Sequence, residues 1–255
     1  MMYKAKKSLG QNFLKSEIAL RKIVEAGEIK QGDVILEIGP GKGALTSKLL
    51  ENAKTVIAIE KDRELFELLK IKFEKEIVNK NLILIEDDCL NFNPRDYGLE
   101  NKTYKLIANI PYNITGAILK KFLTEENQPE LMVLMVQHEV AKRIMARDGK
   151  ESILSISVKA YGEPKMVAKV DKRYFSPAPK VDSAVISIKN ISRRFFDENK
   201  INEEKFWEIV KAGFAHKRKK LSGNLKGLSQ IESLTFLENK RAEDLALADW
   251  INLTN

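Results

Sequence analysis

The regular alternation of short apolar runs with amphipathic stretches constrains the fold of this chain more than any other feature. The apolar runs that we expect as β-strands occupy residues 33–38, 55–60, 81–86, 104–109 and 131–137. The amphipathic stretches that we expect as helices occupy residues 44–52, 62–77 and 115–124. Strands that are apolar at nearly every position and alternate with helices are typical of a parallel sheet covered on both faces. The first two-thirds of the chain therefore predict an α/β fold.

The rest of the chain follows a different pattern. Residues 152–161 are ambiguous between strand and helix. Two strands expected at 165–171 and 181–189 flank a short Pro-containing loop, so they would be antiparallel and give the sheet one reversed edge. From about Ser192 the chain becomes polar and then helical, with helices expected at 203–217, 219–226, 229–238 and 241–252. We predict an α/β domain at residues 1–192 and a small all-α domain at residues 193–255.

The charge balance indicates the kind of partner only weakly. The 44 Lys and Arg residues exceed the 36 Asp and Glu residues by 44 − 36 = 8, and the pI is about 9.3. Such an excess favours a polyanion, although a generally basic proteome gives the same excess. The single cysteine, Cys89, cannot form an internal disulfide, and no apolar run reaches the ~20 residues of a membrane span. The basic N-terminus has no apolar segment behind it, so we expect a cytosolic protein without a secretory signal.

A glycine-rich turn follows the first expected strand. It contains Gly39, Gly41 and Gly43 in the pattern Glu-x-Gly-x-Gly-x-Gly, and a helix follows it. Glycines allow close approach of the backbone to a ligand, and ligands bind at the carboxyl ends of strands in open α/β sheets. The spacing does not match the dinucleotide pattern. Glu60 ends the second strand, where an acid can accept both hydroxyls of a ribose. Taken alone, the glycine-rich turn could be only structural, and Glu60 could be only a carboxylate at a strand end. The two features together favour a nucleotide-like cofactor.

The third expected strand ends in the acids Glu86, Asp87 and Asp88, followed by Cys89. A carboxylate at this position could accept a hydrogen bond from the adenine amine of a cofactor, and Asp88 is our candidate. Asp87 has the alternative role of capping a turn. We expect the Cys89 side chain to pack beside the cofactor.

The fourth expected strand ends in the tetrapeptide Asn109, Ile110, Pro111 and Tyr112. The amine of adenine is a poor nucleophile because its lone pair is delocalised into the ring. The side-chain carbonyl of Asn109 and the backbone carbonyl of Ile110 could accept both N–H groups and localise that lone pair in the transition state. Pro111 would fix the turn, and the Tyr112 ring could stack on the base. The alternative is a plain strand end and turn.

These motifs resemble the ribosomal RNA adenine N6-dimethyltransferase family over nearly the whole chain. The segments that carry the resemblance are Lys7–Leu14, Glu37–Gly43, Glu60, Asp88, Asn109–Tyr112 and Phe175–Ser183. The resemblance implies a Rossmann-like class I methyltransferase fold and S-adenosylmethionine as the cofactor. It implies that Asn12 and Leu14 contact the cofactor, and that Phe175 stacks on the target base opposite Tyr112. The full set of expected cofactor contacts is Gln11, Asn12, Leu14, Gly39, Gly41, Gly43, Glu60, Lys61, Asp88, Cys89 and Asn109, without a metal site.

Two branches of this family compete. One dimethylates two adjacent adenines near the 3′ end of 16S ribosomal RNA, and the other modifies one adenine of 23S ribosomal RNA and gives macrolide resistance. The segments Phe214–Lys226 and Arg241–Leu245 resemble the first branch. Ile110 resembles the second branch, and Ser222-Gly223 interrupts a stretch in which a basic residue is common. We expect the first branch, with small-subunit RNA or its precursor as the partner and a monomeric protein.

Basic residues supply the candidate RNA contacts. They are Lys142, Arg143, Arg147, Lys217, Arg218, Lys219 and Lys220. A charge run is usually a solvated face, but the run at 217–220 opens the predicted small domain, where a member of the family would hold RNA. Two other functions remain as alternatives: an amine methyltransferase acting on DNA or a small molecule, and an assembly factor with an inactive pocket.

Overall fold

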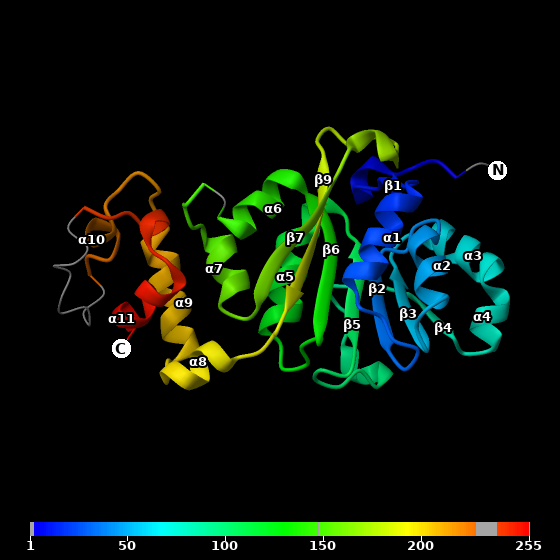
Figure 1. Cartoon of the computed structure of the whole chain (residues 1–255), viewed down its shortest axis with the longest axis horizontal. Helices are drawn as coiled ribbons and strands as arrows, with labels where there is room; N and C mark the ends of the chain where they lie inside the picture. Colours follow the sequence, from blue (N-terminus) through cyan, green and yellow to red (C-terminus); the bar gives the residue numbers. More distant parts are fainter. Residues whose placement is uncertain (1–2, 147, 228–238, 255) are drawn as a thin grey trace. The chain divides into compact units, whose positions relative to one another are not determined.

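The apolar runs form one mostly parallel sheet (Figure 1). The structure, a computed structural model, describes residues 3–146, 148–227 and 239–254. Within those residues the sheet has seven strands in the order β4-β3-β2-β5-β6-β9-β7. Their bounds are β2 (Val34–Ile38), β3 (Thr55–Glu60), β4 (Leu82–Glu86), β5 (Lys105–Asn109), β6 (Leu131–Gln137), β7 (Glu163–Val170) and β9 (Ser183–Lys189). The α/β class and the five parallel strands expected from the sequence are confirmed.

The reversed pairing lies at the edge where the sequence predicts it. Strand β9 runs antiparallel to both β6 and β7, with Met135 opposite Val185 and Pro164 opposite Ile188. It lies between β6 and the last strand, β7, so the reversed strand is second from the edge.

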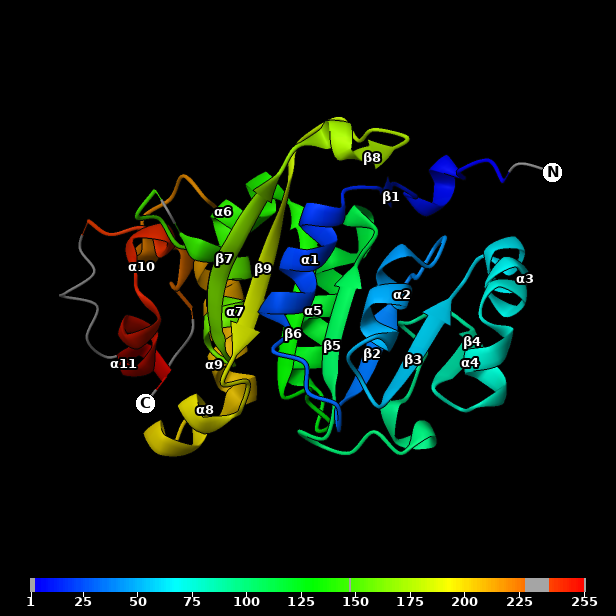
Figure 2. The same cartoon turned by 45° about the vertical axis from the view of Figure 1, so that its right-hand side comes forward.

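The helices of this part of the chain cover both faces of the sheet. They are α1 (Glu17–Ala26), α2 (Ala44–Leu50), α3 (Arg63–Lys72), α4 (Glu74–Val78) and α5 (Thr115–Thr124). Helix α1 was not predicted; Ser16 caps its first turn by accepting a hydrogen bond from the Ala19 N–H at 3.3 Å. The stretch expected as one helix at 62–77 breaks at Phe73, which has φ −115°. Helix α5 lies on the face of the sheet opposite α1 (Figure 2).

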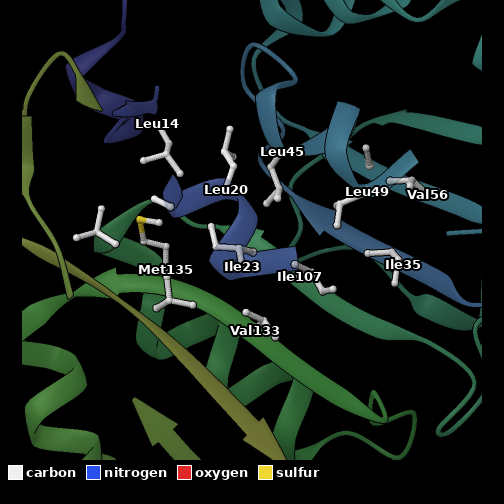
Figure 3. Close-up of a cluster of buried hydrophobic side chains, with 14 of the residues drawn as sticks. Leu14, Leu20, Ile23, Ile35, Leu45, Leu49, Val56, Ile107, Val133 and Met135 are labelled. Atoms are coloured by element: carbon white, nitrogen blue, oxygen red, sulfur yellow. The ribbon is translucent and has the colours of Figure 1, made fainter. Parts of the chain in front are cut away.

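The apolar core on the α1 face fixes these helices to the sheet (Figure 3). Alternate strand residues point into it, and each side chain shown there from β2, β5, β6, α1 and α2 is at most 6% exposed. They include Ile35, Ile107, Val133 and Met135 from the strands and Leu20, Ile23, Leu45 and Leu49 from the helices. Burying such a side chain stabilises the fold by roughly 1.5–3 kcal/mol. The core therefore holds rigid the loops that leave the carboxyl ends of the strands.

The direction of the strand order reverses between β2 and β5. Strands β3 and β4 follow β2 on one side, and β6 lies beyond β5 on the other. The loops that leave neighbouring strands at such a reversal diverge and open a crevice, where open α/β sheets bind their ligands.

Contacts divide the chain into two compact units. The first comprises Met1–Ala141 and Glu163–Ile191, and the second comprises Lys142–Gly162 and Ser192–Asn255. The structure thus groups residues 142–162 with the C-terminal segment, whereas the sequence pattern predicts them in the first domain. The ambiguous stretch at 152–161 is a helix, α7 (Ile153–Lys159), whose Ser152 and Ser155 side chains form a capping box.

The second unit is helical, but its helices are shorter than expected. They are α8 (Arg194–Asn199), α9 (Glu203–Gly213), α10 (Leu221–Asn224) and α11 (Ile251–Thr254), and α6 (His138–Met145) extends into the unit from the first. Helix α9 ends before the basic run, because the Asn224 side chain donates to the carbonyls of Gly213 at 2.6 Å and His216 at 3.2 Å. The helix expected at 241–252 is mostly two 3₁₀ turns, since Asp244 and Asp249 accept hydrogen bonds from backbone N–H groups three residues earlier.

The helix expected at 229–238 lies outside the described residues. Among the helices that the structure does describe, none combines the length and the apolar character that crossing a membrane requires.

Candidate active site

A cavity of about 540 Å³ opens at the carboxyl ends of β2, β3, β4 and β5. Its walls are the glycine-rich turn after β2, the ends of β3 and β4, the turn after β5 and the N-terminal segment. The predicted site residues that line it are Gln11, Asn12, Leu14, Gly39, Gly41, Glu60, Lys61, Asp88, Cys89, Asn109, Ile110, Pro111 and Tyr112. Predicted site residues up to 112 − 11 = 101 positions apart in the sequence therefore meet at one crevice.

The glycine-rich turn lies against the Glu60 carboxylate. Glu60 Oε2 accepts a hydrogen bond from the Gly41 N–H at 3.0 Å, and Oε1 accepts one from the Asp62 N–H at 2.9 Å. The side chain is buried, and burial raises the pKa of Glu60 although these backbone donors act in the opposite direction. Gly41 has φ +60°, and a Cβ there would lie 3.0 Å from the Phe13 ring. The turn needs glycine both for its backbone conformation and for the close approach of Phe13.

Asp88 is held in place by two partners. Its Oδ2 accepts a hydrogen bond from Lys61 Nζ at 2.7 Å, and its Oδ1 accepts one from the Leu90 N–H at 3.0 Å. The Lys61 ammonium, followed by the Leu90 N–H, lowers the pKa of Asp88. Asp87 Oδ1 accepts from the N–H of the next residue, Asp88, at 2.6 Å, whereas the turn-capping bond from the N–H two residues on is the one that Asp88 accepts from Leu90. Burial raises the pKa of the Cys89 thiol to about 12, so at neutral pH it is a protonated, packed side chain.

The tetrapeptide at the end of β5 lies beside the N-terminal segment. Asn109 Nδ2 donates to the backbone carbonyl of Asn12 at 3.3 Å, and no hydrogen bond between described residues engages its Oδ1. Pro111 has φ −60° and ψ 132°, which turns the chain at the cavity wall. The Tyr112 hydroxyl hydrogen-bonds to Ser183 Oγ at 2.5 Å and thereby fixes the ring. Burial raises the pKa of Tyr112, so the hydroxyl stays neutral.

Two predicted site residues do not line the cavity. Gly43, at φ +72°, starts α2, and a Cβ there would lie 2.5 Å from the Phe73 ring, so its requirement is packing. Phe175 is 3% exposed and belongs to the apolar core, on a short strand, β8 (Phe175–Ser176). Strand β8 pairs antiparallel with β1 (Phe13–Leu14), and its Ser176 does line the cavity. In this conformation Phe175 packs in the apolar core, and its stacking on a base stays a prediction.

The candidate RNA contacts that the structure describes are exposed. Lys142 and Arg143 lie on α6, and the run Lys217–Lys220 lies in the turn between α9 and α10. Both groups belong to the second unit. Lys220 Nζ donates to Asn239 Oδ1 at 2.7 Å. Arg147 lies outside the described residues.

Two acidic residues near the site were given no role of their own from the sequence, although Glu37 is the first residue of the glycine-rich motif. Glu37, in the cavity wall, is 1% exposed, and no hydrogen bond between described residues engages its Oε2. Burial and the nearby Glu60 charge raise the pKa of Glu37 to about 8. Asp62 forms a hydrogen-bond network with the N-terminal segment. The available signals were an acid inside an apolar strand for Glu37 and a second acid two residues after Glu60 for Asp62.

Comparison with known proteins identifies the family. The sequence model of the ribosomal RNA adenine dimethylase family matches residues 2–255. The chain belongs to this family. A relative from Dehalococcoides mccartyi, named ribosomal RNA small subunit methyltransferase A, is 40% identical over 98% of this chain and 87% of its own length. A relative of the same name from Fusobacterium nucleatum is 40% identical over 99% of this chain and 97% of its own.

Solved structures agree with the family and with the Rossmann-like methyltransferase fold. A dimethyladenosine transferase from Plasmodium falciparum is 29% identical, with a TM-score of 0.80 over 94% of this chain and 95% of that one. The 23S ribosomal RNA methyltransferase ErmE is 25% identical, with a TM-score of 0.74 over 95% of this chain and 98% of that one. The predicted family, fold class and enzyme class are confirmed.

Proposed function

We propose that this protein uses S-adenosylmethionine to dimethylate the N6 amine of two adjacent adenines near the 3′ end of 16S ribosomal RNA. The observation that carries the proposal is the position of Asn109. Its Oδ1 is available at the wall of the same cavity that contains Glu60 and Asp88. An acceptor for an amine thus lies beside acceptors for a nucleoside.

The residues of the cavity fit S-adenosylmethionine. The volume of about 540 Å³ lies within the range of roughly 300–1,000 Å³ that small-molecule sites occupy. A Cβ at Gly41 would crowd the Phe13 ring in the cavity wall, and the buried Glu37 Oε2 has no hydrogen-bond partner among the described residues. Glu60 retains lone pairs for ribose hydroxyls and Asp88 for an adenine amine. When bound, the cofactor supplies an electrophilic methyl group on a sulfonium.

The protein's part in the reaction is to orient the amine. Asn109 Oδ1 and the Ile110 carbonyl would accept its two N–H groups, which localises the nitrogen lone pair for attack. Tyr112, fixed by Ser183, offers a flat ring beside that position, and stacking of a base contributes about 1–3 kcal/mol. The described lining residues include no histidine. A general base is not required, because the methylated amine is cationic and releases its proton readily.

The relatives favour the small-subunit branch over the 23S branch. The proteins named as small-subunit enzymes are 40% identical to this chain, whereas ErmE is 25% identical. Ile110 resembles the 23S enzymes, but the residue is only 2% exposed, so its side chain is buried and would not select between the two substrates. The substrate would be small-subunit RNA or its precursor in the cytoplasm, met by a monomeric protein. The two domains would divide cofactor binding and RNA contact between them.

Mass spectrometry of ribosomal RNA tests this function. The protein and cofactor are incubated with unmethylated small subunits, large subunits, free 16S RNA and free 23S RNA. We expect N6,N6-dimethyladenosine at two neighbouring positions near the 3′ end of 16S RNA. Methylation of 23S RNA instead would select the other branch, and no methylation of any RNA would leave a non-catalytic assembly factor as the better description.

Lys219→Glu should weaken RNA binding in a salt-dependent way. The Lys219 side chain is exposed in the turn after α9, where it can lie near phosphates. Loss of one phosphate contact should reduce the slope of log affinity against log salt by about 1. Binding is measured by filter retention across a salt titration. Lys54→Glu makes the same charge change on an exposed residue just before β3, away from the cavity, and is the matched control. Equal losses for the two variants, or unchanged affinity for Lys219→Glu, would contradict the role of this basic run.

A further inference from the structure

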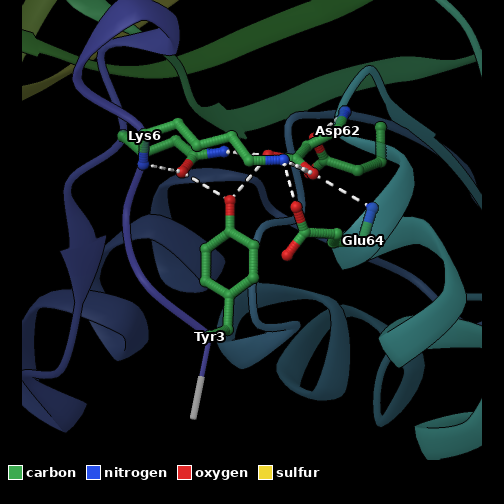
Figure 4. A network of polar contacts seen from close by, with 6 residues as sticks. Tyr3, Lys6, Asp62 and Glu64 are labelled. Atoms are coloured by element: carbon green, nitrogen blue, oxygen red, sulfur yellow. Dashed lines mark hydrogen bonds and ion pairs between the residues drawn. The ribbon is translucent and has the colours of Figure 1, made fainter. Parts of the chain in front are cut away.

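A network of hydrogen bonds joins the N-terminal segment to the Asp62 carboxylate (Figure 4). Asp62 Oδ1 accepts from Lys6 Nζ at 2.9 Å, and Oδ2 accepts from Gln11 Nε2 at 3.0 Å and lies 2.6 Å from the Tyr3 hydroxyl. Gln11 Oε1 in turn accepts from the Lys6 N–H at 2.7 Å. The Asp62 side chain is 0% exposed, so these donors replace the water that a buried carboxylate loses.

These donors stabilise the ionised form of the Asp62 carboxylate. Burial acts to raise the pKa of Asp62, but hydrogen bonds from Lys6, Tyr3 and Gln11 outweigh it and lower the pKa to about 2. The carboxylate is therefore ionised throughout the neutral range. Glu64 also contacts Lys6 at 2.7 Å, but its side chain is 67% exposed, and such exposed pairs contribute little.

The same residue also contacts the cofactor-binding machinery through its backbone. The Asp62 N–H donates to Glu60 Oε1 at 2.9 Å, and the other Glu60 oxygen accepts from Gly41. One residue thus connects the N-terminal segment to the acid that would bind the ribose.

The anchored segment forms a wall of the cavity. Every residue from Ser8 to Lys15 lines it, and the Asn12 carbonyl within this stretch accepts from Asn109 Nδ2. The Phe13 ring packs on Gly41 and meets the Tyr3 ring edge-on at 5.9 Å. Gln11 was predicted as a cofactor contact, but its side-chain amide forms hydrogen bonds with Asp62, Lys6 and Tyr3.

We propose that Asp62 is a positioning residue for the cofactor. Through its hydrogen bonds with Gln11, Lys6 and Tyr3, Asp62 holds residues 8–15 in place as a wall of the cavity. The proposal rests on the proposed function, since it takes S-adenosylmethionine as the ligand. Asp62 itself does not contact the reacting atoms. Asp62 keeps residues 8–15 in the conformation that binds the cofactor. Cofactor binding therefore does not have to order this segment.

Asp62→Asn tests this hydrogen-bond network with almost no change in side-chain volume. The new amide keeps one oxygen as an acceptor and places N–H donors at the other position, where either Lys6 or Gln11 also presents a donor. We expect the Kd for S-adenosylmethionine, measured by calorimetry on the full chain without RNA, to rise about tenfold to a hundredfold. In steady-state kinetics, KM for the cofactor should rise while kcat at saturating cofactor stays near the wild-type value. Trypsin should cleave after Lys6 and Lys7 faster than in wild type, and the cofactor should slow that cleavage.

Glu64→Gln is the matched control, because it removes a carboxylate from the same Lys6 and leaves the buried one in place. It should leave Kd and cleavage unchanged. Tyr3→Phe removes one donor to Asp62 without touching Asp62 or Glu60, and a smaller rise in Kd with faster cleavage would support the proposal even if Asp62→Asn does not fold.

Three results would overturn the inference while wild type still binds the cofactor. The first is that Asp62→Asn has the same Kd and cleavage rate as wild type. The second is that its melting temperature falls while its Kd does not change. The third is that its kcat falls while its KM does not change. A wild-type protein that binds no S-adenosylmethionine would instead overturn the proposed function and this inference together.

Discussion

Replacing Asn109 with alanine should lower kcat for adenine methylation about 100- to 1,000-fold, the usual cost of removing one preorganised polar group from a transition state. The amide oxygen of Asn109 is the acceptor that localises the amine lone pair, and alanine has no acceptor. RNA binding should change little, because the basic residues lie elsewhere. Single-turnover methylation at saturating cofactor measures the chemical step, and filter binding measures the affinity for RNA.

Asn52→Ala is the control for the Asn109 variant. Asn52 is exposed, and its amide donates only to the Lys48 carbonyl in the structure described, so the same substitution there should leave kcat unchanged. A parallel loss of RNA affinity and turnover in Asn109→Ala would show that Asn109 binds substrate in the ground state rather than favouring the transition state.

The parallel sheet could be predicted because its strands are apolar on both faces. The run at 131–137 became β6 with the expected bounds, and the helix expected at 115–124 became α5. The C-terminal helices were overestimated because local contacts end them. Asn224 caps the end of α9 from eleven residues away, and this interaction leaves no periodic signal in the sequence.

The cavity could be predicted for the same reason as the sheet. Glu60, Asp88 and Asn109 each end a parallel strand, so the fold brings them to one edge once the strands are assigned. Phe175 could not be placed in this way. Its burial depends on the pairing of two short strands, Phe13–Leu14 and Phe175–Ser176, that are far apart in the chain.

The Asp62 network was also beyond prediction. Its partner Tyr3 is 59 residues away in the sequence, and Asp62 already has a local role as the N-cap of α3. Because the N-cap role already accounts for an aspartate at this position, the sequence does not indicate its long-range hydrogen bonds.

Glu37→Gln should stabilise the protein relative to wild type increasingly as the pH rises from about 5 to about 8. The pKa of Glu37 is raised from 4.5 to about 8 by burial and by Glu60, so the native state keeps a proton that the unfolded state loses. Wild type therefore loses stability as the pH rises through this window. A shift of this size corresponds to about 4–5 kcal/mol at pH 8 and above. Glutamine cannot ionise, so the variant escapes this loss.

Urea unfolding of both proteins at several pH values measures the effect, since the pH dependence of groups that do not interact with Glu37 cancels in the difference. Glu51→Gln makes the same substitution on an exposed side chain at the end of α2 and is the matched control. A difference for Glu37→Gln that stays constant with pH would mean that Glu37 is already ionised in the folded protein. If the difference grows as expected, the cavity wall holds a carboxyl that is protonated at neutral pH, and a cation bound beside it would favour its ionised form. Binding of the sulfonium form of the cofactor should then release a proton to the buffer in calorimetry, and binding of its uncharged thioether product should release less.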